Sequence, residues 1–374
     1  MSVITNNNDL ISFCDKLQSA KFITVDTEFT RERTYYPRLC LLQISDGTNS
    51  AAFDPLEDID LSPIFQIFFN DNITKVFHSA KQDLEIIYNI TGKIPQNIFD
   101  TQIAASICGY GEQVSYKTLV FELLSIKLDK TEQYTDWAFR PLSKKQIHYA
   151  LSDVTHLVEI YKILHSKLFE LGRKSLNEDE TASLLNEETY NVNENKAWLK
   201  IKFKQTSKKF VYSVAKLAAW RELKAREVDI PRSHLMSDRV LLATATSFQS
   251  SNRKLDQKSR EFFQKYEQEL LAIQAEIESC KEYIIDYPKA EYNTKKDSAL
   301  LSMLRLLLKI KASEYGVAEK IIASTKDLED FCNNKSSRIM QDWQYEVFGK
   351  QAEDLKNGKI AMHYQDEQIK ISEI

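Results

Sequence analysis

Four carboxylates stand in three separated segments of this 374-residue chain, and two of them are neighbours. Asp26 and Glu28 belong to residues 22–29 (FITVDTEF), a β-branched run typical of a strand, in which residues two apart share a face. Two acids side by side at the end of an apolar strand repel each other unless a cation lies between them. The pair therefore predicts a metal site.

The third acid, Asp83, follows a predicted apolar strand at residues 73–77. The sequence after this strand, HSAKQDLEII at residues 78–87, predicts a helix that Ser79 could cap. Asp83 is then expected one turn into that helix.

The fourth acid, Asp153, is predicted on a long helix. Ser143 and Gln146 have the spacing of a capping box, and apolar residues continue after them at helical intervals. Tyr149 and Asp153 are four residues apart, so both side chains emerge from one face. A phenol beside a metal-binding carboxylate can position a water molecule or help to deprotonate it.

Each of these pieces has an ordinary explanation when taken alone. An acidic pair at a strand end is commonly a solvated edge, and an acid on a helix is usually a surface charge. Three such segments in this order argue against coincidence. Oxygen ligands without a Cys or His cluster favour Mg²⁺ or Mn²⁺ over zinc.

The same segments resemble the ribonuclease D family. The resemblance is carried by residues 25–29 (VDTEF), 31–37, 41–44 (LLQI), 78–85 (HSAKQDLE), 100–102, 135–137, 140–143, 146, 149–150 and 153–154. It implies a 3′-to-5′ exoribonuclease of the tyrosine-bearing group, with an RNase H-like α/β fold and two divalent metal ions, Mg²⁺ or Mn²⁺.

The resemblance also implies roles for the candidate residues. Asp26, Glu28 and Asp153 would hold one ion, Asp26 and Asp83 would act on the second, and Tyr149 would orient the attacking water. The implied partner is RNA with a single-stranded 3′ end, in particular tRNA precursors, with no nucleotide cofactor.

His148 offers an alternative to Tyr149, because its distance of five residues from Asp153 fits a histidine-bearing group of the same superfamily. If the helix begins near Ser143, His148 is turned roughly 140° from Asp153, against roughly 40° for Tyr149. We therefore assign Tyr149 to the site and interpret His148 as a flanking or surface residue.

Candidate RNA contacts lie beside the acids. Arginines surround two tyrosines just after Glu28, a mixture suited to phosphate contacts and base stacking. The predicted contacts are Arg31, Arg33, Tyr35, Tyr36, Arg38, Lys81 and Gln82. An exposed hairpin with ordinary surface arginines is the alternative. Lysines at 196, 200, 202, 204, 208 and 209 alternate with aromatic residues, and form either an RNA-facing strip or a solvated face beside core residues.

Four parts are predicted along the chain: an exonuclease domain at 1–173, a polar connecting segment at 174–205, a helical domain at 206–290 and a second helical domain at 291–374. Residues 212–232 resemble the helicase-and-RNase-D C-terminal (HRDC) domain, and the last part resembles a degenerate second copy. Both are expected to be all-α bundles.

Composition limits the remaining function classes. The net charge is only −4, so attraction to nucleic acid must be local, and 43% hydrophobic residues can fill several cores. Five scattered cysteines, no leader pattern and no apolar run of membrane-spanning length predict a cytoplasmic protein with no membrane partner. The sequence does not predict the oligomeric state. Two rival functions remain open at this point: a DNA exonuclease of the same fold, and an inactive RNA-binding scaffold.

Overall fold

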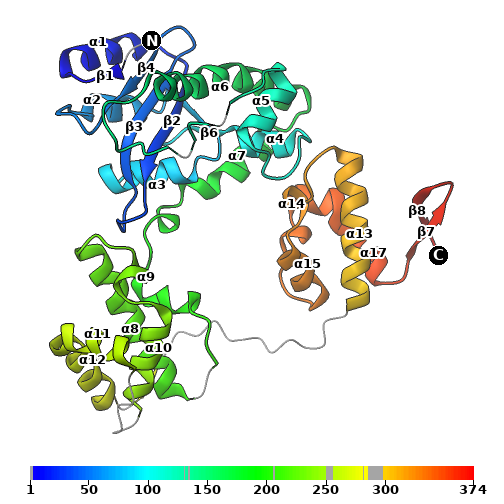
Figure 1. The fold of residues 1–374 in the computed structure, drawn as a ribbon. Helices are drawn as coiled ribbons and strands as arrows, with labels where there is room; N and C mark the ends of the chain where they lie inside the picture. The colour runs from blue at the N-terminus through cyan, green and yellow to red at the C-terminus, as the bar shows by residue number, and fades with distance from the viewer. Residues whose placement is uncertain are drawn as a thin grey trace.

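A mixed six-stranded sheet organises the N-terminal part of the chain (Figure 1). The computed structural model describes residues 3–129, 131–133, 135–204, 207–249, 256–280, 282–284 and 298–374. The strands are β1 (Val3–Ile4), β2 (Phe22–Thr30), β3 (Arg38–Ser45), β4 (Ser50–Phe53), β5 (Thr74–Phe77) and β6 (Ile98–Asp100), in the order β1-β4-β3-β2-β5-β6. β3 is antiparallel to β2 and β4, and the other pairs are parallel.

Helices cover both faces of this sheet. One face packs on α1 (Asn7–Leu17), α2 (Ser62–Phe68) and α3 (Lys81–Thr91), and the other on α4 (Thr101–Ile107), α5 (Tyr116–Leu124) and α6 (Lys144–Glu170). Ile23 and Val25 of β2 belong to the first core, whereas Thr24 Oγ1 donates to the Val154 carbonyl of α6 at 2.8 Å. Alternate residues of β2 therefore face opposite layers, as its period of two predicts.

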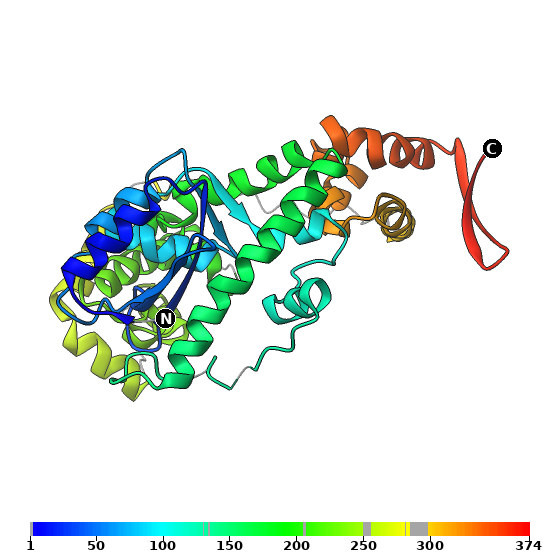
Figure 2. The same cartoon turned by 90° about the horizontal axis from the view of Figure 1, so that it is seen from above.

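The long helix α6 runs across the sheet (Figure 2) and begins where the sequence predicts. The capping box is present, since the Ser143 hydroxyl accepts from the Gln146 amide and the Gln146 side chain accepts from the Ser143 amide. Just before it, Arg140 donates to both carboxylate oxygens of Asp54, at 2.5 and 2.7 Å, and to the Cys40 carbonyl. These bonds fasten the start of α6 to β3 and to the end of β4.

The start of α3 differs from the prediction. Ser79 has a left-handed φ of +62° and does not cap the helix, whose N-cap residue is Ala80. The Asp100 carboxylate instead accepts from the amides of Ser79 at 3.1 Å and Ala80 at 2.8 Å, and also caps α4. The prediction for Ser79 was wrong because a side chain distant in sequence supplies the acceptor.

The predicted connecting segment, 174–205, is described as far as residue 204, and residues 174–204 are folded despite their weak periodicity. They contain α7 (Lys174–Ala182) and the short 3₁₀ turns Ser183–Leu185, Glu187–Thr189 and Glu194–Lys200. Tyr190 is buried in the core beneath the sheet, whereas Trp198 is buried in the core of the next part. This segment therefore packs on both the N-terminal part and the helical part that follows it.

The next part is a helical bundle. It contains α8 (Lys208–Glu227), α9 (Arg232–Leu235), α10 (Asp238–Ser247), α11 (Gln257–Lys265) and α12 (Glu267–Ser279). Trp198, Phe203 and Phe210 belong to its core or pack against it, while Lys202 and Lys204 are exposed. The aromatic residues of the lysine-rich stretch are thus mainly core residues, which is the second of the two interpretations given above.

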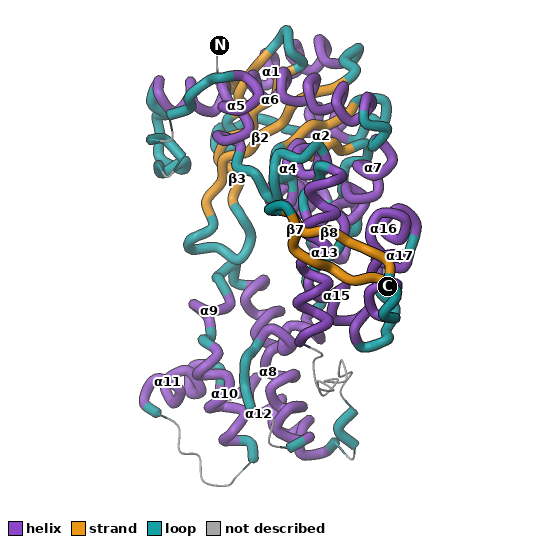
Figure 3. The backbone as a smooth tube through the Cα atoms, turned by 90° about the vertical axis from the view of Figure 1, so that its right-hand side faces the viewer, coloured by secondary structure: helices purple, strands orange, loops and turns teal. Residues whose placement is uncertain are grey.

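The last part is helical up to residue 356 and ends in a hairpin (Figure 3). Its helices are α13 (Ser298–Tyr315), α14 (Glu319–Ile322), α15 (Thr325–Cys332), α16 (Asp342–Gln344) and α17 (Lys350–Lys356), and its strands are β7 (Ile360–Gln365) and β8 (Gln368–Glu373). The all-α prediction was wrong for this hairpin. Its turn residues Asp366 and Glu367 both have positive φ, yet the sequence lacks the glycine or asparagine that normally marks such a turn.

The last part packs on the exonuclease-like part through a shared apolar core. Leu304 and Leu307 of α13 belong to the same buried cluster as Ala104 of α4 and Leu164 of α6. The Ala318 amide also donates to the Ser106 carbonyl at 2.9 Å. Among the described residues, no helix is both long and apolar enough to cross a bilayer.

Candidate active site

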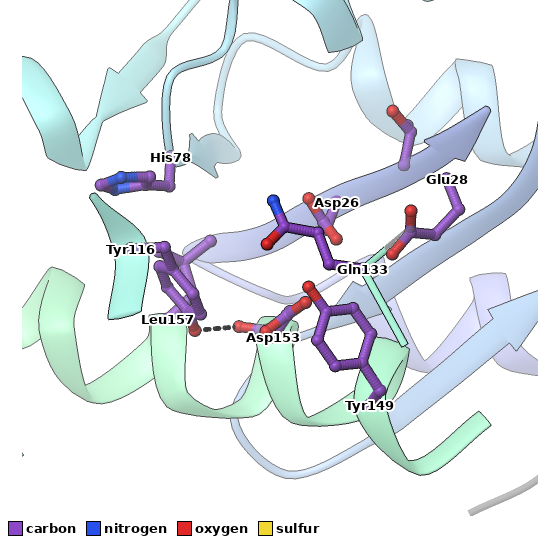
Figure 4. Close-up of a pocket in the computed structure, with 9 residues that line it drawn as sticks. Asp26, Glu28, His78, Tyr116, Gln133, Tyr149, Asp153 and Leu157 are labelled. Atoms are coloured by element: carbon purple, nitrogen blue, oxygen red, sulfur yellow. Dashed lines mark hydrogen bonds between the residues drawn. The ribbon is translucent and has the colours of Figure 1, made fainter. Parts of the chain in front are cut away.

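Three of the four predicted acids meet in one cleft between β2 and α6 (Figure 4). One carboxylate oxygen each from Asp26, Glu28 and Asp153 lie within 4.8 Å of one another. The cleft has a volume of about 190 Å³, and is lined by Asp26, Thr27, Glu28, His78, Tyr116, Gln133, Tyr149, Asp153 and Leu157.

Strand and helix periodicity bring these groups together. Asp26 and Glu28 lie on the same face of β2 as Thr24, and Thr24 donates to α6. Tyr149 and Asp153 are one turn apart on α6 and both line the cleft. The contact between β2 and α6 therefore turns two local patterns into one cluster.

Asp83 lies at the side of this cluster. It is 8% exposed, on the first turn of α3, and its Oδ1 accepts from the Thr27 hydroxyl at 2.5 Å. It is not among the three acids whose oxygens lie within 4.8 Å. Burial, and then the negative charge of Asp26, raise the pKa of Asp83 well above its ordinary value. A cation shared by these two would need the side chains to approach or a bridging ligand.

The acids are held in protein surroundings that disfavour their charge. Burial raises the pKa of Asp26 to about 7. Burial, followed by the repulsion of Asp26, Asp153 and Asp83, raises the pKa of Glu28 to about 10. Burial and then Asp26 also raise the pKa of Asp153 well above its ordinary value. Such a cluster binds protons unless a cation compensates the negative charge.

The donor set suits a hard divalent cation. The three converging side chains offer only carboxylate oxygens, which are the ligands that Mg²⁺ and Mn²⁺ prefer. Among the described residues that line the cleft there is no lysine or arginine, so the close approach of the acids further favours a cation. The residues therefore fit a metal site.

Tyr149 and His148 occupy different environments. The Tyr149 hydroxyl lies beside the Asp153 carboxylate, and its ring centroid lies 6.2 Å from that of Trp137. His148 is exposed and does not line the cleft. Burial, and then Asp153, raise the pKa of Tyr149, so the phenol keeps its proton at neutral pH. The geometry therefore favours Tyr149 over His148 as the group beside the acids.

Several cleft residues were missed by sequence reasoning. The Tyr116 hydroxyl donates to the backbone carbonyl of Asp153, and its ring lies 5.3 Å from that of His78. His78 is held by Thr101 Oγ1 at 3.0 Å and by the Val114 carbonyl at 3.2 Å. His78 stood in a recognised motif, but neither the start of α5 nor Gln133 carried a local signal.

The predicted RNA contacts divide into two groups. Arg31 makes a bidentate salt bridge with Glu85, at 2.7 and 2.9 Å. Tyr35 docks on the α8–α12 bundle: its hydroxyl donates to Glu222 at 2.5 Å, and its amide donates to Asp229 at 2.9 Å. Arg33, Tyr36, Arg38, Lys81 and Gln82 are exposed. Arg31 and Tyr35 already have partners within the protein, so neither is retained among the proposed RNA contacts.

Comparisons with known proteins give a consistent result. Residues 1–169 match a family described as 3′-5′ exonuclease, and residues 213–273 match the HRDC domain. Ribonuclease D of Bartonella henselae is 39% identical, with 100% of this chain and 94% of the relative covered. Ribonuclease D of a Jannaschia species is 38% identical, with 99% of each covered. The crystal structure of Escherichia coli RNase D, described as an exoribonuclease involved in structured RNA processing, superposes with a TM-score of 0.81 at 26% identity, covering 95% of this chain and 98% of that one.

The N-terminal α/β domain with its acidic cleft is a 3′-5′ exonuclease domain. The helical bundle that follows it in sequence is an HRDC domain. At this level of identity over the full length, the chain belongs to the ribonuclease D family, and it is a 3′-5′ exoribonuclease with an RNase H-like catalytic domain.

Proposed function

We propose that this protein shortens RNA from its 3′ end by hydrolysis, releases 5′-mononucleotides, and requires two divalent cations, Mg²⁺ or Mn²⁺. The observation that carries the proposal is the convergence of Asp26, Glu28 and Asp153 within 4.8 Å, with the Tyr149 hydroxyl beside them. Like charges at this distance are stable only with protons or with cations.

The proposed ligands follow from the geometry. Asp26, Glu28 and Asp153 would hold one cation, and Asp26 together with Asp83 would serve the other. When bound, such cations stabilise negative charge on the attacking and leaving oxygens of an in-line displacement.

Tyr149 is proposed to orient the attacking water. Because its pKa is raised, the phenol is a hydrogen-bond donor at neutral pH and not a base. The hydroxyl lies beside the Asp153 carboxylate at the edge of the acid cluster. A water molecule there would donate one O–H to the phenol oxygen, which leaves a lone pair of the water free to face the phosphodiester.

The proposed substrate class is RNA with a single-stranded 3′ end, with tRNA precursors as the cellular example. A single strand exposes its terminal phosphodiester and bases, as a cleft between a strand and a helix requires. Support comes from the E. coli relative, which is described as acting in structured RNA processing. The exposed side chains of Arg33, Tyr36, Arg38, Lys81 and Gln82 are the proposed contacts.

Two wider expectations belong to the same proposal. The parts 1–173, 174–205, 206–290 and 291–374 are proposed as catalytic domain, connection, HRDC domain and degenerate second HRDC-like domain. The cytoplasm is the proposed location, because five cysteines scattered along the chain, three of them buried, suit a reducing compartment.

The test is degradation of a 5′-labelled tRNA that carries a 3′ tail, compared with a DNA strand of the same sequence. With Mg²⁺ or Mn²⁺, the RNA should give a ladder that shortens from the 3′ end, with mononucleotides as product, and EDTA should stop the reaction. Faster cleavage of the DNA would support the rival deoxyribonuclease, and binding without cleavage in either metal would support the inactive scaffold.

A further inference from the structure

A buried glutamine amide lies next to the acid cluster without an assigned role. Gln43, in the middle of β3, is fully buried at 0% exposure. Within the part of the chain that the structure describes, neither its Oε1 nor its Nε2 has a hydrogen-bond partner. A buried amide without partners is unfavourable, so a glutamine at this position calls for an explanation beyond packing.

The strand register places Gln43 directly opposite Asp26. The two residues are paired in the β2–β3 ladder, before the irregularity at Glu28 and Phe29. Directly opposite residues of an antiparallel pair have Cβ atoms about 4.5–5.5 Å apart and side chains on one face. A glutamine side chain is long enough to bring its terminal amide to a carboxylate at that separation.

The surrounding residues fix the face on which Gln43 lies. Its neighbours along β3, Leu42 and Ile44, belong to the core with α1, α2 and α3. Leu41, two residues before it, instead packs with Ala150 and Leu151 of α6. Gln43 therefore faces α6, on the same side as Asp26.

Asp26 is the polar residue directly opposite this amide in the strand ladder. The residue opposite Gln43 on its other side is Ala52 of β4, whose side chain offers no polar group. Gln43 is not among the described residues that line the cleft. A donor outside the cleft can act on the acid without touching a substrate.

We propose that Gln43 is a positioning residue for the Asp26 carboxylate. In the metal-loaded protein its amide N–H, which has no partner among the described residues, donates to Asp26 and holds that carboxylate in the orientation that converges with Glu28 and Asp153. A neutral donor achieves this without neutralising the acid, so the negative charge remains available to a cation. The inference rests on the proposed metal site, and it assigns to Gln43 the kind of supporting bond that typically changes metal affinity about 10- to 100-fold.

The test uses the full-length protein with Gln43→Met, which keeps the length of the side chain and removes both polar groups. Leu41→Met is the matched control, because Leu41 lies on the same strand and face and has no amide to lose. Mn²⁺ binding is measured by titration calorimetry, and thermal unfolding is measured in EDTA. Gln43→Met should lower the Mn²⁺ affinity about 10- to 100-fold. Its melting temperature in EDTA should equal or exceed that of the wild type, and Leu41→Met should bind Mn²⁺ as the wild type does.

Gln43→Leu repeats the measurement if the methionine variant does not fold. Wild-type Mn²⁺ affinity in the folded Gln43 variant would overturn the role of Gln43 while leaving the metal site intact. An equal loss of affinity in Leu41→Met would also overturn it, because packing would then explain the effect. A wild-type protein that binds no Mn²⁺ would overturn the proposed metal site itself, and this inference with it.

Discussion

The acid cluster and the segment that follows it, residues 31–38, are neighbours in sequence but have different fates in the structure. Asp26 and Glu28 converge with Asp153 from α6 on a shared cleft. Arg31 is instead paired with Glu85, and Tyr35 is bonded to the HRDC domain. Both sets of residues were predicted to serve the reaction, and only the acids have kept their side chains directed into the cleft.

The acids and the residues of segment 31–38 differ in whether other side chains of the protein can satisfy them. Converging carboxylates repel one another, so their negative charge calls for protons or a cation. Arginine and tyrosine readily find acidic or polar partners within the protein, and then cease to be free for RNA. A residue type that the protein itself can satisfy is therefore a weaker functional signal than a group of like charges.

The largest effect is expected at the acids. Asp26→Asn should lower turnover by about 10⁴-fold or more, since several kcal/mol of transition-state stabilisation are lost with the central ligand. RNA binding and the fold should persist. Single-turnover cleavage of 3′-tailed RNA in Mg²⁺ measures the loss, with the exposed Asp58→Asn as a control for charge. Turnover near that of the wild type would remove Asp26 from the site.

A smaller loss is expected beside the cluster. Tyr149→Phe deletes only the hydroxyl beside Asp153, and should lower turnover about 10²- to 10⁴-fold with little change in RNA affinity. His148→Ala should have little effect, because His148 is exposed outside the cleft. The reverse pattern, with the histidine essential and the phenol dispensable, would assign the chain to the histidine-bearing group.

The segment 31–38 should matter through the domain contact. Tyr35→Phe removes the bond to Glu222, which is 1% exposed, and a bond to a charged group contributes about 1.5–3 kcal/mol. If the HRDC domain contacts RNA, we expect a loss of about tenfold on tailed tRNA, which is long enough to extend beyond the cleft, and no loss on a short single-stranded RNA. Rates on both substrates are compared with those of Tyr364→Phe, a 73% exposed tyrosine on the hairpin. Equal losses on both substrates would mean that Tyr35 acts on the cleft itself.

The smallest effect is a pH dependence of stability in EDTA. The folded pKa values of Asp26, about 7, and Glu28, about 10, lie above the unfolded values of about 4. Protonation of these two carboxylates in the folded state adds to the free energy of unfolding. This contribution is complete below pH 4, and it is lost as the pH rises through 7 for Asp26 and towards 10 for Glu28. The melting temperature should therefore fall between pH 5 and 9, by roughly 2–4 °C for each kcal/mol. Asp26→Asn should fall less steeply, and an identical slope in the two proteins would contradict the raised pKa.

The fold could be predicted where local patterns suffice. The alternation of residues 22–29 predicted β2, and the capping box at Ser143 and Gln146 predicted the start of α6. Together these elements placed Tyr149 and Asp153 on one face, and Asp26 with Glu28 on another. The contact of Thr24 with Val154 then brings the two faces together, which the local patterns alone did not reveal.

Features that depend on distant partners could not be predicted in this way. Asp100 of β6 accepts from the Ala80 amide at the start of α3, and Tyr35 meets Glu222 only because the HRDC domain folds back on the β2–β3 turn. The terminal hairpin lacks a glycine in its turn, so no local signal separated it from the helices before it. Gln43 stood in a recognised motif, but its relation to Asp26 required the strand register.

The acid cluster formed by Asp26, Glu28 and Asp153 is proposed to bind the catalytic cations. The most direct measurement is the number of Mn²⁺ ions bound by the metal-free full-length protein, followed by the loss of the free Mn²⁺ electron paramagnetic resonance signal, for the wild type and for Asp26→Asn. We expect the wild type to bind two Mn²⁺ ions and Asp26→Asn to show a clear loss of Mn²⁺ binding. Equal binding by the two proteins, or none by the wild type, would contradict it.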